Sequence, residues 1–226
     1  MIQRELLGTA AIPGGEELRL FRRTLKGGDE FSIMLGRIEL MNSRLSGSEE
    51  ALATLTCKRL RAKNPRILIG GYGMGFTLRA ALTVLPNQAH IEVAELIPAI
   101  VDWARGPMAE LSSDCLDDTR VKISIGDVRK IIAAADREYD AILLDVDNGP
   151  DGLTKGDNEQ LYGMTGLSTA KSALRAGGIL AIWSSGPDAA FGKRLQKSGF
   201  AVEEKTVSAR ANGKGAKHTI WLATNE

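Results

Sequence analysis

Three acidic residues, Glu95, Asp127 and Asp145, lie at or just past the ends of apolar, strand-like segments of this chain. In a parallel sheet the carboxyl ends of the strands open on one crevice, where carboxylates can accept hydrogen bonds from a ligand. Close to a bound cation, acids also attract positively charged substrates and can take up a departing proton. The pattern therefore predicts a ligand site at one edge of a sheet.

A run of glycines, Gly70, Gly71, Gly73 and Gly75, follows the first of these segments. Glycines allow positive φ angles and let a ligand lie against the backbone, with the amides of the next helix pointing at it. The dinucleotide fingerprint G-x-G-x-x-G fails, because a larger residue stands where its third glycine belongs from either possible start. The spacing G-x-G-x-G instead fits a site for S-adenosylmethionine or a close analogue.

The acids and their neighbours have expected roles around such a ligand. We expect Glu95, with Leu96 beside it, to hold the ribose hydroxyls. Asp127 can accept from the adenine amino group while the Val128 amide donates to the ring. Two structural alternatives stay open: Glu95 can be a solvated strand-end carboxylate, and Asp127 can be the N-cap of a helix that starts at Val128.

The segment after Asp145 is long for a strand-to-helix connection and rich in Gly and Asp, a composition typical of loops that close over a site or are simply mobile. Asp145 ends its strand and is our candidate catalytic base, with Asp147 as a substrate-binding acid. Asp151 and Asp157 are more typical of solvated turns.

From residue 66 onward, apolar strands alternate with amphipathic helices, which predicts a mostly parallel sheet. The expected strands are 66–70, 90–95, 121–125, 140–145, 178–184, 200–208 and 218–224, and the expected helices are 75–85, 98–111, 128–135, 159–176 and 188–198. The last two strands are joined by too few residues for a helical crossover, so they should form an antiparallel hairpin.

The first 45 residues differ from the rest. Segments 17–25 and 31–41 predict a short β-hairpin, which we treat as an extension of an α/β domain spanning 46–226. Ser46 and Glu49 have the spacing of a capping box, and a helix should follow and end near Asn64, which precedes a proline.

Composition excludes several classes of protein. A chain of 226 residues with a net charge of +1 offers no bulk attraction for nucleic acid or membranes. It has no membrane-length apolar run and no signal-peptide pattern, so we expect a cytoplasmic protein. Two histidines and two widely separated cysteines give no metal-binding spacing, and we expect no metal site.

Several motifs together resemble spermidine synthase and its relatives, the polyamine aminopropyltransferases. They are Gly70-Gly71-Tyr72-Gly73-Met74-Gly75, Glu95-Leu96-Ile97-Pro98, Gly126-Asp127-Val128, Asp145-Val146-Asp147 and Leu161-Tyr162. The resemblance covers roughly residues 30 to 226. It implies the Rossmann-like class I methyltransferase fold, a seven-stranded sheet with the C-terminal antiparallel hairpin.

By this resemblance Asp145 deprotonates the attacking amine, and Asp147, Glu39 and Tyr162 bind the substrate. Three positions depart from the family pattern. Gly73 stands where the family has an acid, Glu39 where it has a glutamine, and Ser48 where it has a tyrosine lining the substrate.

These departures lead us to expect methyl transfer from S-adenosylmethionine to a small polar or cationic acceptor. The alternatives are aminopropyl transfer from decarboxylated S-adenosylmethionine to a diamine, and a nucleoside-binding protein without catalysis. Either transfer requires the nucleophile to lie opposite the departing sulfur. We expect small-molecule partners and a homodimer.

Overall fold

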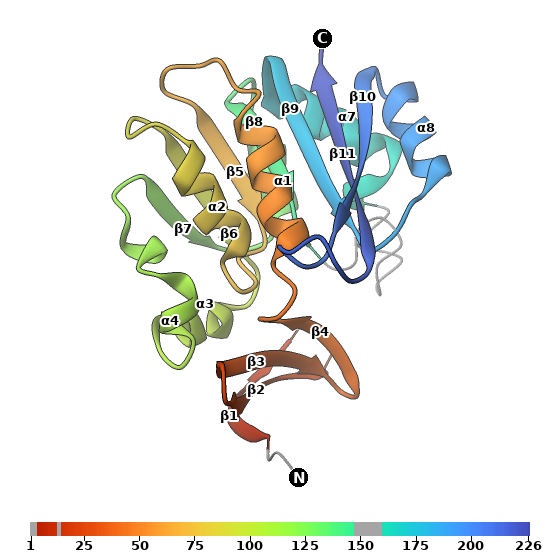
Figure 1. The fold of residues 1–226 in the computed structure, drawn as a ribbon. Helices are drawn as coiled ribbons and strands as arrows, with labels where there is room; N and C mark the ends of the chain where they lie inside the picture. Colours follow the sequence, from red (N-terminus) through yellow and green to blue (C-terminus); the bar gives the residue numbers. More distant parts are fainter. Residues whose placement is uncertain (1–3, 13–14, 147–159) are drawn as a thin grey trace.

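The computed structural model describes residues 4–12, 15–146 and 160–226. They form a small antiparallel sheet and a larger three-layer α/β unit. The small sheet lies below the larger unit in Figure 1. The carboxyl end of β5 (Arg66–Gly70) in the large sheet points toward the small sheet (Figure 1).

The N-terminal sheet has four strands in the order β1-β2-β3-β4, each antiparallel to its neighbour. The strands are β1 (Glu5–Ala11), β2 (Glu17–Leu25), β3 (Gly28–Leu35) and β4 (Ile38–Asn42). The predicted hairpin is the β2–β3 pair at its centre. Our predicted return strand over 31–41 is two strands, because the chain reverses at Gly36, where φ is +57°. The sequence analysis did not predict β1.

The large sheet has seven strands in the order β10-β11-β9-β8-β5-β6-β7. Apart from β5, they are β6 (His90–Glu95), β7 (Val121–Ile125), β8 (Tyr139–Leu144), β9 (Leu174–Ser184), β10 (Phe200–Ser208) and β11 (Lys217–Asn225). Strands β5 to β9 pair in parallel, and β11 runs antiparallel to both β9 and β10. The predicted fold class, with its C-terminal hairpin, is confirmed.

Helices cover both faces of this sheet (Figure 1). One face carries α1 (Gly47–Cys57), α2 (Phe76–Val84), α3 (Pro98–Arg105), α4 (Ala109–Ser112) and the 3-10 turn η1 (Cys115–Asp117). The other carries α5 (Val128–Ala134), α7 (Met164–Ala173) and α8 (Ala189–Lys197). Alternate residues of the central strands feed the two cores: Ile69 and Leu143 face the first, and Leu68 and Leu144 the second.

Three helix predictions were wrong in their limits. The helix predicted to reach Asn64 ends at Cys57, where the sequence becomes mostly charged and has no further apolar face to bury. The helix predicted over 98–111 is interrupted after Arg105, because Gly106 ends α3 and the following proline cannot donate a helical hydrogen bond. The helix predicted over 159–176 gives way at Leu174 to β9, which therefore begins before the predicted residue 178.

The capping box predicted at Ser46 is also absent. Ser46 has a helical backbone, with φ −101° and ψ −17°, and its side chain makes no capping hydrogen bond. Its carbonyl already accepts the Glu50 amide at 2.9 Å. The Glu49 side chain is therefore not used as a cap and is available to the site described below. The predicted boundary at 45/46 stays a prediction; β4 ends at Asn42 and α1 begins at Gly47.

The turn after β5 depends on Gly71. Its φ is +83°, and a Cβ there would lie 2.6 Å from the Asp145 carbonyl oxygen. We predict that Gly71→Ala lowers the free energy of unfolding by about 2 kcal/mol or more, from backbone strain and the clash together. Urea unfolding followed by circular dichroism measures this loss.

Gly213→Ala is the matched control, because Gly213 has a similar φ of +78° with nothing near the added Cβ. It should cost only about 1 kcal/mol. Equal losses in the two variants would show that the approach of Gly71 to Asp145 is not a constraint.

Candidate functional site

The glycine turn joins three strands where they end. The Gly71 amide donates to the Ala94 carbonyl on β6 at 2.9 Å, and the Asp145 amide donates to the Gly70 carbonyl at 3.0 Å. Glu95 and Asp145 are thereby fixed on either side of the turn. The turn's own larger side chains, Tyr72 and Met74, are buried in the first core, so only its backbone faces the crevice.

Glu95 is buried at the end of β6 and holds two backbone amides. Its Oε2 accepts the Tyr72 amide at 2.9 Å and its Oε1 accepts the Ile97 amide at 2.8 Å. Burial raises the pKa of Glu95, and these amides oppose the rise. A carboxylate has lone pairs beyond those already used, so it can still accept from ligand hydroxyls. Its neighbour Leu96 is 52% exposed, which leaves an apolar surface beside it.

Asp127 caps α5, as the structural alternative predicted. Its Oδ1 accepts the Arg129 amide at 2.8 Å, and the Arg129 guanidinium pairs with Oδ2 at 2.7 Å. Burial would raise the pKa of Asp127, but the contacts with Arg129 outweigh it and lower the pKa. Val128 is buried against Gly70, so only its backbone is suited to contact a ligand. The predicted contacts with adenine stay predictions.

Asp145 follows β8 directly, and its carboxyl group turns toward α2. Thr77, in the first turn of that helix, donates from Oγ1 to Asp145 Oδ2 at 2.7 Å. Burial raises the pKa of Asp145 to about 6, a rise that the bond from Thr77 limits. A carboxyl with this pKa is mostly ionised at neutral pH and still basic enough to accept a proton.

Glu49, from the first turn of α1, is the second carboxyl at this place. Burial and the charges of Asp145 and Glu50 raise the pKa of Glu49 to about 9. The Thr77 hydroxyl lies 3.4 Å from the Glu49 carbonyl oxygen, which brings α1, α2 and the end of β8 together. The structure therefore places Thr77 and Glu49 in the candidate site together with Asp145.

The position where the resemblance leads one to expect a tyrosine is polar in this chain. Ser48 is buried, and its Oγ lies 2.8 Å from His218 Nδ1 on β11. The His218 ring stands edge-on to Trp183 with the ring centroids 4.9 Å apart, and burial lowers the pKa of His218. In place of the expected tyrosine, this part of the site therefore has the hydrogen-bonded pair Ser48 and His218, with the Trp183 ring packed against His218.

The other predicted substrate residues are Glu39, Tyr162 and Asp147. Glu39 is on β4, where Arg44 pairs with Oε1 at 2.8 Å. Tyr162 is almost fully buried in the second core, edge-on to Phe191. Asp147 lies outside the described residues. The roles of Glu39 and Tyr162 in binding the substrate stay predictions.

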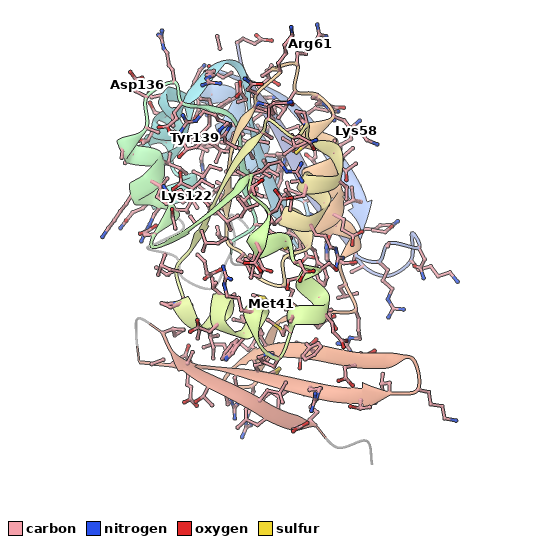
Figure 2. The ribbon with its side chains drawn as sticks, turned by 90° about the vertical axis from the view of Figure 1, so that its left-hand side faces the viewer. Met41, Lys58, Arg61, Lys122, Asp136 and Tyr139 are labelled. Carbon is pink, nitrogen blue, oxygen red and sulfur yellow. The ribbon has the colours of Figure 1, made fainter. Side chains whose placement is uncertain are left out.

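The N-terminal sheet contributes a residue that the sequence analysis missed. Met41 Sδ on β4 lies 3.6 Å from where a Gly73 Cβ would be, so β4 lies against the glycine turn. Figure 2 shows Met41 at the junction of the two sheets, with Lys58 and Arg61 at the far end of the molecule. The small sheet thus reaches the glycine turn of the large one.

The next two observations concern metal-binding groups and membrane-spanning helices. Within the described ranges, no three His, Cys, Asp or Glu residues are grouped in a way that could hold a metal ion. A search of the same residues finds no helix with the length and hydropathy to cross a membrane.

The fold is that of solved spermidine synthases. The crystal structure of spermidine synthase from Thermotoga maritima superimposes with a TM-score of 0.75 at 17% identity, covering 98% of this chain and 72% of that one. A probable spermidine synthase from Corynebacterium glutamicum gives 0.62 at 15% identity. At these identities the likeness establishes the fold alone.

Sequence comparison supplies the family. The spermine/spermidine synthase domain model matches residues 48–188, and the chain belongs to this family. The polyamine aminopropyltransferase of Korarchaeum cryptofilum is 28% identical over 128 residues, 56% of this chain and 38% of that protein. That of Pseudomonas syringae is 28% identical over 148 residues, 66% of this chain and 46% of that one. The matches span less than half of these relatives.

We predict that Thr77→Val raises the pKa of Asp145 above its value of about 6, because the hydroxyl stabilises the ionised carboxylate. Valine keeps the shape of threonine and removes the donor. Carbon-13 NMR of the aspartate side-chain carboxyls across pH measures the change, with Asp145→Asn assigning the resonance.

Thr83→Val is the control on the same helix, because the Thr83 hydroxyl bonds the Ala80 carbonyl within the helix. It should leave the Asp145 titration unchanged. An unaltered pKa in Thr77→Val would remove Thr77 from the site.

Proposed function

We propose that this chain is an aminopropyltransferase that uses decarboxylated S-adenosylmethionine and an amine acceptor. Membership of the spermine/spermidine synthase family supports this alternative over methyl transfer, our leading interpretation from sequence, which the comparisons do not support. The observation that carries the proposal is Asp145: a half-buried carboxylate with a raised pKa, held by Thr77, at the strand end beside the glycine turn.

The donor would lie along the glycine turn. Glu95 would hold its ribose, Asp127 and the Val128 amide its adenine, and the exposed Leu96 would lie against the nucleoside. Glu95 is already fixed by two amides, so little reorganisation is needed when it accepts from hydroxyls. This arrangement directs the sulfonium end of the donor toward Asp145.

The reaction is a displacement at the carbon of the aminopropyl group that is bonded to sulfur. Asp145 takes a proton from the acceptor's ammonium group, leaving a nitrogen lone pair. That lone pair forms the new C–N bond while the C–S bond breaks, and its electron pair returns to sulfur to give neutral methylthioadenosine. Most of the acceleration comes from holding nitrogen, carbon and sulfur in line.

The first test is product formation. We predict that the purified chain, given decarboxylated S-adenosylmethionine and putrescine or a related diamine, forms methylthioadenosine and an aminopropylated amine, detected by mass spectrometry. Asp145→Asn should lower the turnover at least about 100-fold, the contribution of a general base. Transfer of methyl groups from intact S-adenosylmethionine, without aminopropyl product, would contradict the proposal.

The pH profile gives a second readout of Asp145. Because the base must be ionised, kcat/KM should rise with pH through about 6 and then level off until another group titrates. A profile without this acidic limb would point to a different base.

The donor site makes a separate prediction. Glu95→Gln should weaken the binding of methylthioadenosine by about 1–3 kcal/mol, the range for a lost charge-assisted hydrogen bond. Isothermal titration calorimetry measures the affinity, and circular dichroism checks that the variant is folded.

Glu92→Gln is the control on the same strand, since Glu92 bonds Lys122, Ser124 and Tyr139 rather than the glycine turn. It should bind methylthioadenosine as the wild type does. Unchanged affinity in a folded Glu95→Gln variant would refute the ribose role. The predicted homodimer and cytoplasmic location stay predictions.

A further inference from the structure

Glu49 lies beside the proposed base, although nothing in the sequence indicated it. It belongs to the first turn of α1, which runs beside α2 (Figure 1). The Thr77 hydroxyl on α2 is 3.4 Å from the Glu49 carbonyl oxygen and 2.7 Å from Asp145 Oδ2. One threonine therefore connects the backbone of Glu49 with the carboxylate of Asp145.

One oxygen of the half-buried Glu49 carboxyl group has no partner among the described residues, and the hydrogen bond that lowers its pKa comes from its own backbone amide. Its Oε2 is shielded from solvent and accepts no hydrogen bond from the described residues. Its neighbour Glu50 differs, because Arg79 pairs with Glu50 Oε1 at 3.2 Å. A carboxylate that is shielded from solvent, is held by a single backbone amide and faces no cation is unfavourable. Glu49 must therefore keep a proton or meet a cation from outside the described residues.

The charged groups around Glu49 offer no such cation. On its own helix Glu50 adds negative charge, and on α2 Arg79 is engaged by Glu50. On β11 His218 is bonded to Ser48, and burial lowers its pKa. Asp145, after β8, is itself a carboxylate. Of the described residues, no cation lowers the pKa of Glu49 or of Asp145.

We propose that Glu49 and Asp145 form a carboxyl pair that shares one proton in the free protein, and that Glu49 releases this proton when the ammonium group of the acceptor enters. The proposal rests on the proposed function in one respect, that the acceptor is an amine. It makes Glu49 a residue that recognises the cation, while Asp145 remains the base.

The protons balance through the cycle. With pKa values of about 9 for Glu49 and about 6 for Asp145, the pair holds one proton and one negative charge between these limits. An entering ammonium lowers the pKa of a nearby acid, so Glu49 loses its proton to solvent. Asp145 then takes the ammonium's proton in the transfer step. The pair therefore again holds one proton when the product leaves, and each turnover releases one proton to solvent. The carboxylate of Glu49 stabilises the ammonium before the transfer step. An acceptor without a positive charge makes no such interaction, so the pair selects for protonated amines.

The direct test is carbon-13 NMR of the chain labelled at its glutamate carboxyl carbons, with Glu49→Gln identifying the resonance. In the free protein the Glu49 carboxyl should titrate near 9. Saturating putrescine should bring its midpoint to about 7 or below, as expected for a close opposite charge. In calorimetry at pH 8, in buffers of different ionisation enthalpy, putrescine binding should release close to one proton from the wild type and almost none from Glu49→Gln.

Glu203→Gln is the control, since it makes the same change of charge on β10, where Glu203 pairs with Arg59 and Lys205 on the surface. It should release as many protons as the wild type. The stability of Glu49→Gln is a readout that needs no ligand. A carboxyl whose pKa is raised on folding destabilises the native state increasingly as pH rises from about 4.5 to about 9. The melting temperature of Glu49→Gln should therefore exceed that of the wild type by more at pH 9 than at pH 6.

The outcomes separate this inference from the proposed function. A Glu49 resonance that titrates near the ordinary glutamate value of about 4.3 would overturn the shared proton, whatever the turnover assay shows. Undiminished proton release in Glu49→Gln, with putrescine bound, would overturn its role toward the amine. If no amine binds or reacts, the proposed function fails together with that role, while the titration of the free protein still decides whether the pair shares a proton.

Discussion

The site depends on the close approach of two strand ends, β5 and β8. The Asp145 amide donates to the Gly70 carbonyl, and the Asp145 carbonyl lies so near Gly71 that a side chain there would overlap it. This contact requires glycine in the turn. It also fixes the backbone of Asp145, whose carboxylate accepts a hydrogen bond from the Thr77 hydroxyl at 2.7 Å.

Burial determines what the acids around this contact can do. Asp127 is held ionised by Arg129, whereas Glu95 is held by backbone amides and has a raised pKa. Asp145 and Glu49 are buried together without a counter-charge from the described residues. The first two are suited to accept hydrogen bonds from a neutral nucleoside, and the second two to receive a cation and a proton. In the proposed function the first two would hold the donor and the second two would receive the amine.

Much of this could be predicted from the sequence, because strand ends and glycine turns leave local signals. The strands 66–70, 90–95 and 121–125 were predicted with the bounds the structure gives them, and they placed Glu95 and Asp127 at the crevice. The N-cap at Asp127 is a local effect too. Asp145 was identified because it interrupts an apolar run where a parallel strand must end.

The remainder depends on contacts between distant segments. Glu49 has the spacing of a capping residue, and only the packing of α1 beside α2 brings it close enough to Asp145 for the charge of Asp145 to raise its pKa. The one sequence signal for Thr77 is its place in the first helical turn after the glycines. That place makes its hydroxyl a candidate hydrogen-bond donor to an acid at a neighbouring strand end. The four-stranded N-terminal sheet was underestimated because β1 is short, largely exposed and lacks a strong alternation.

We propose that one site holds a nucleoside on Glu95 and an amine on the Asp145 side of the glycine turn. A crystal structure of the chain with methylthioadenosine and a diamine bound tests it most directly. We predict ribose hydroxyls within hydrogen-bond distance of Glu95, and an ammonium nitrogen bonded to Asp145 with Glu49 facing it. A nucleoside bound away from Glu95, or an amine that leaves Asp145 and Glu49 uncontacted, would contradict the account.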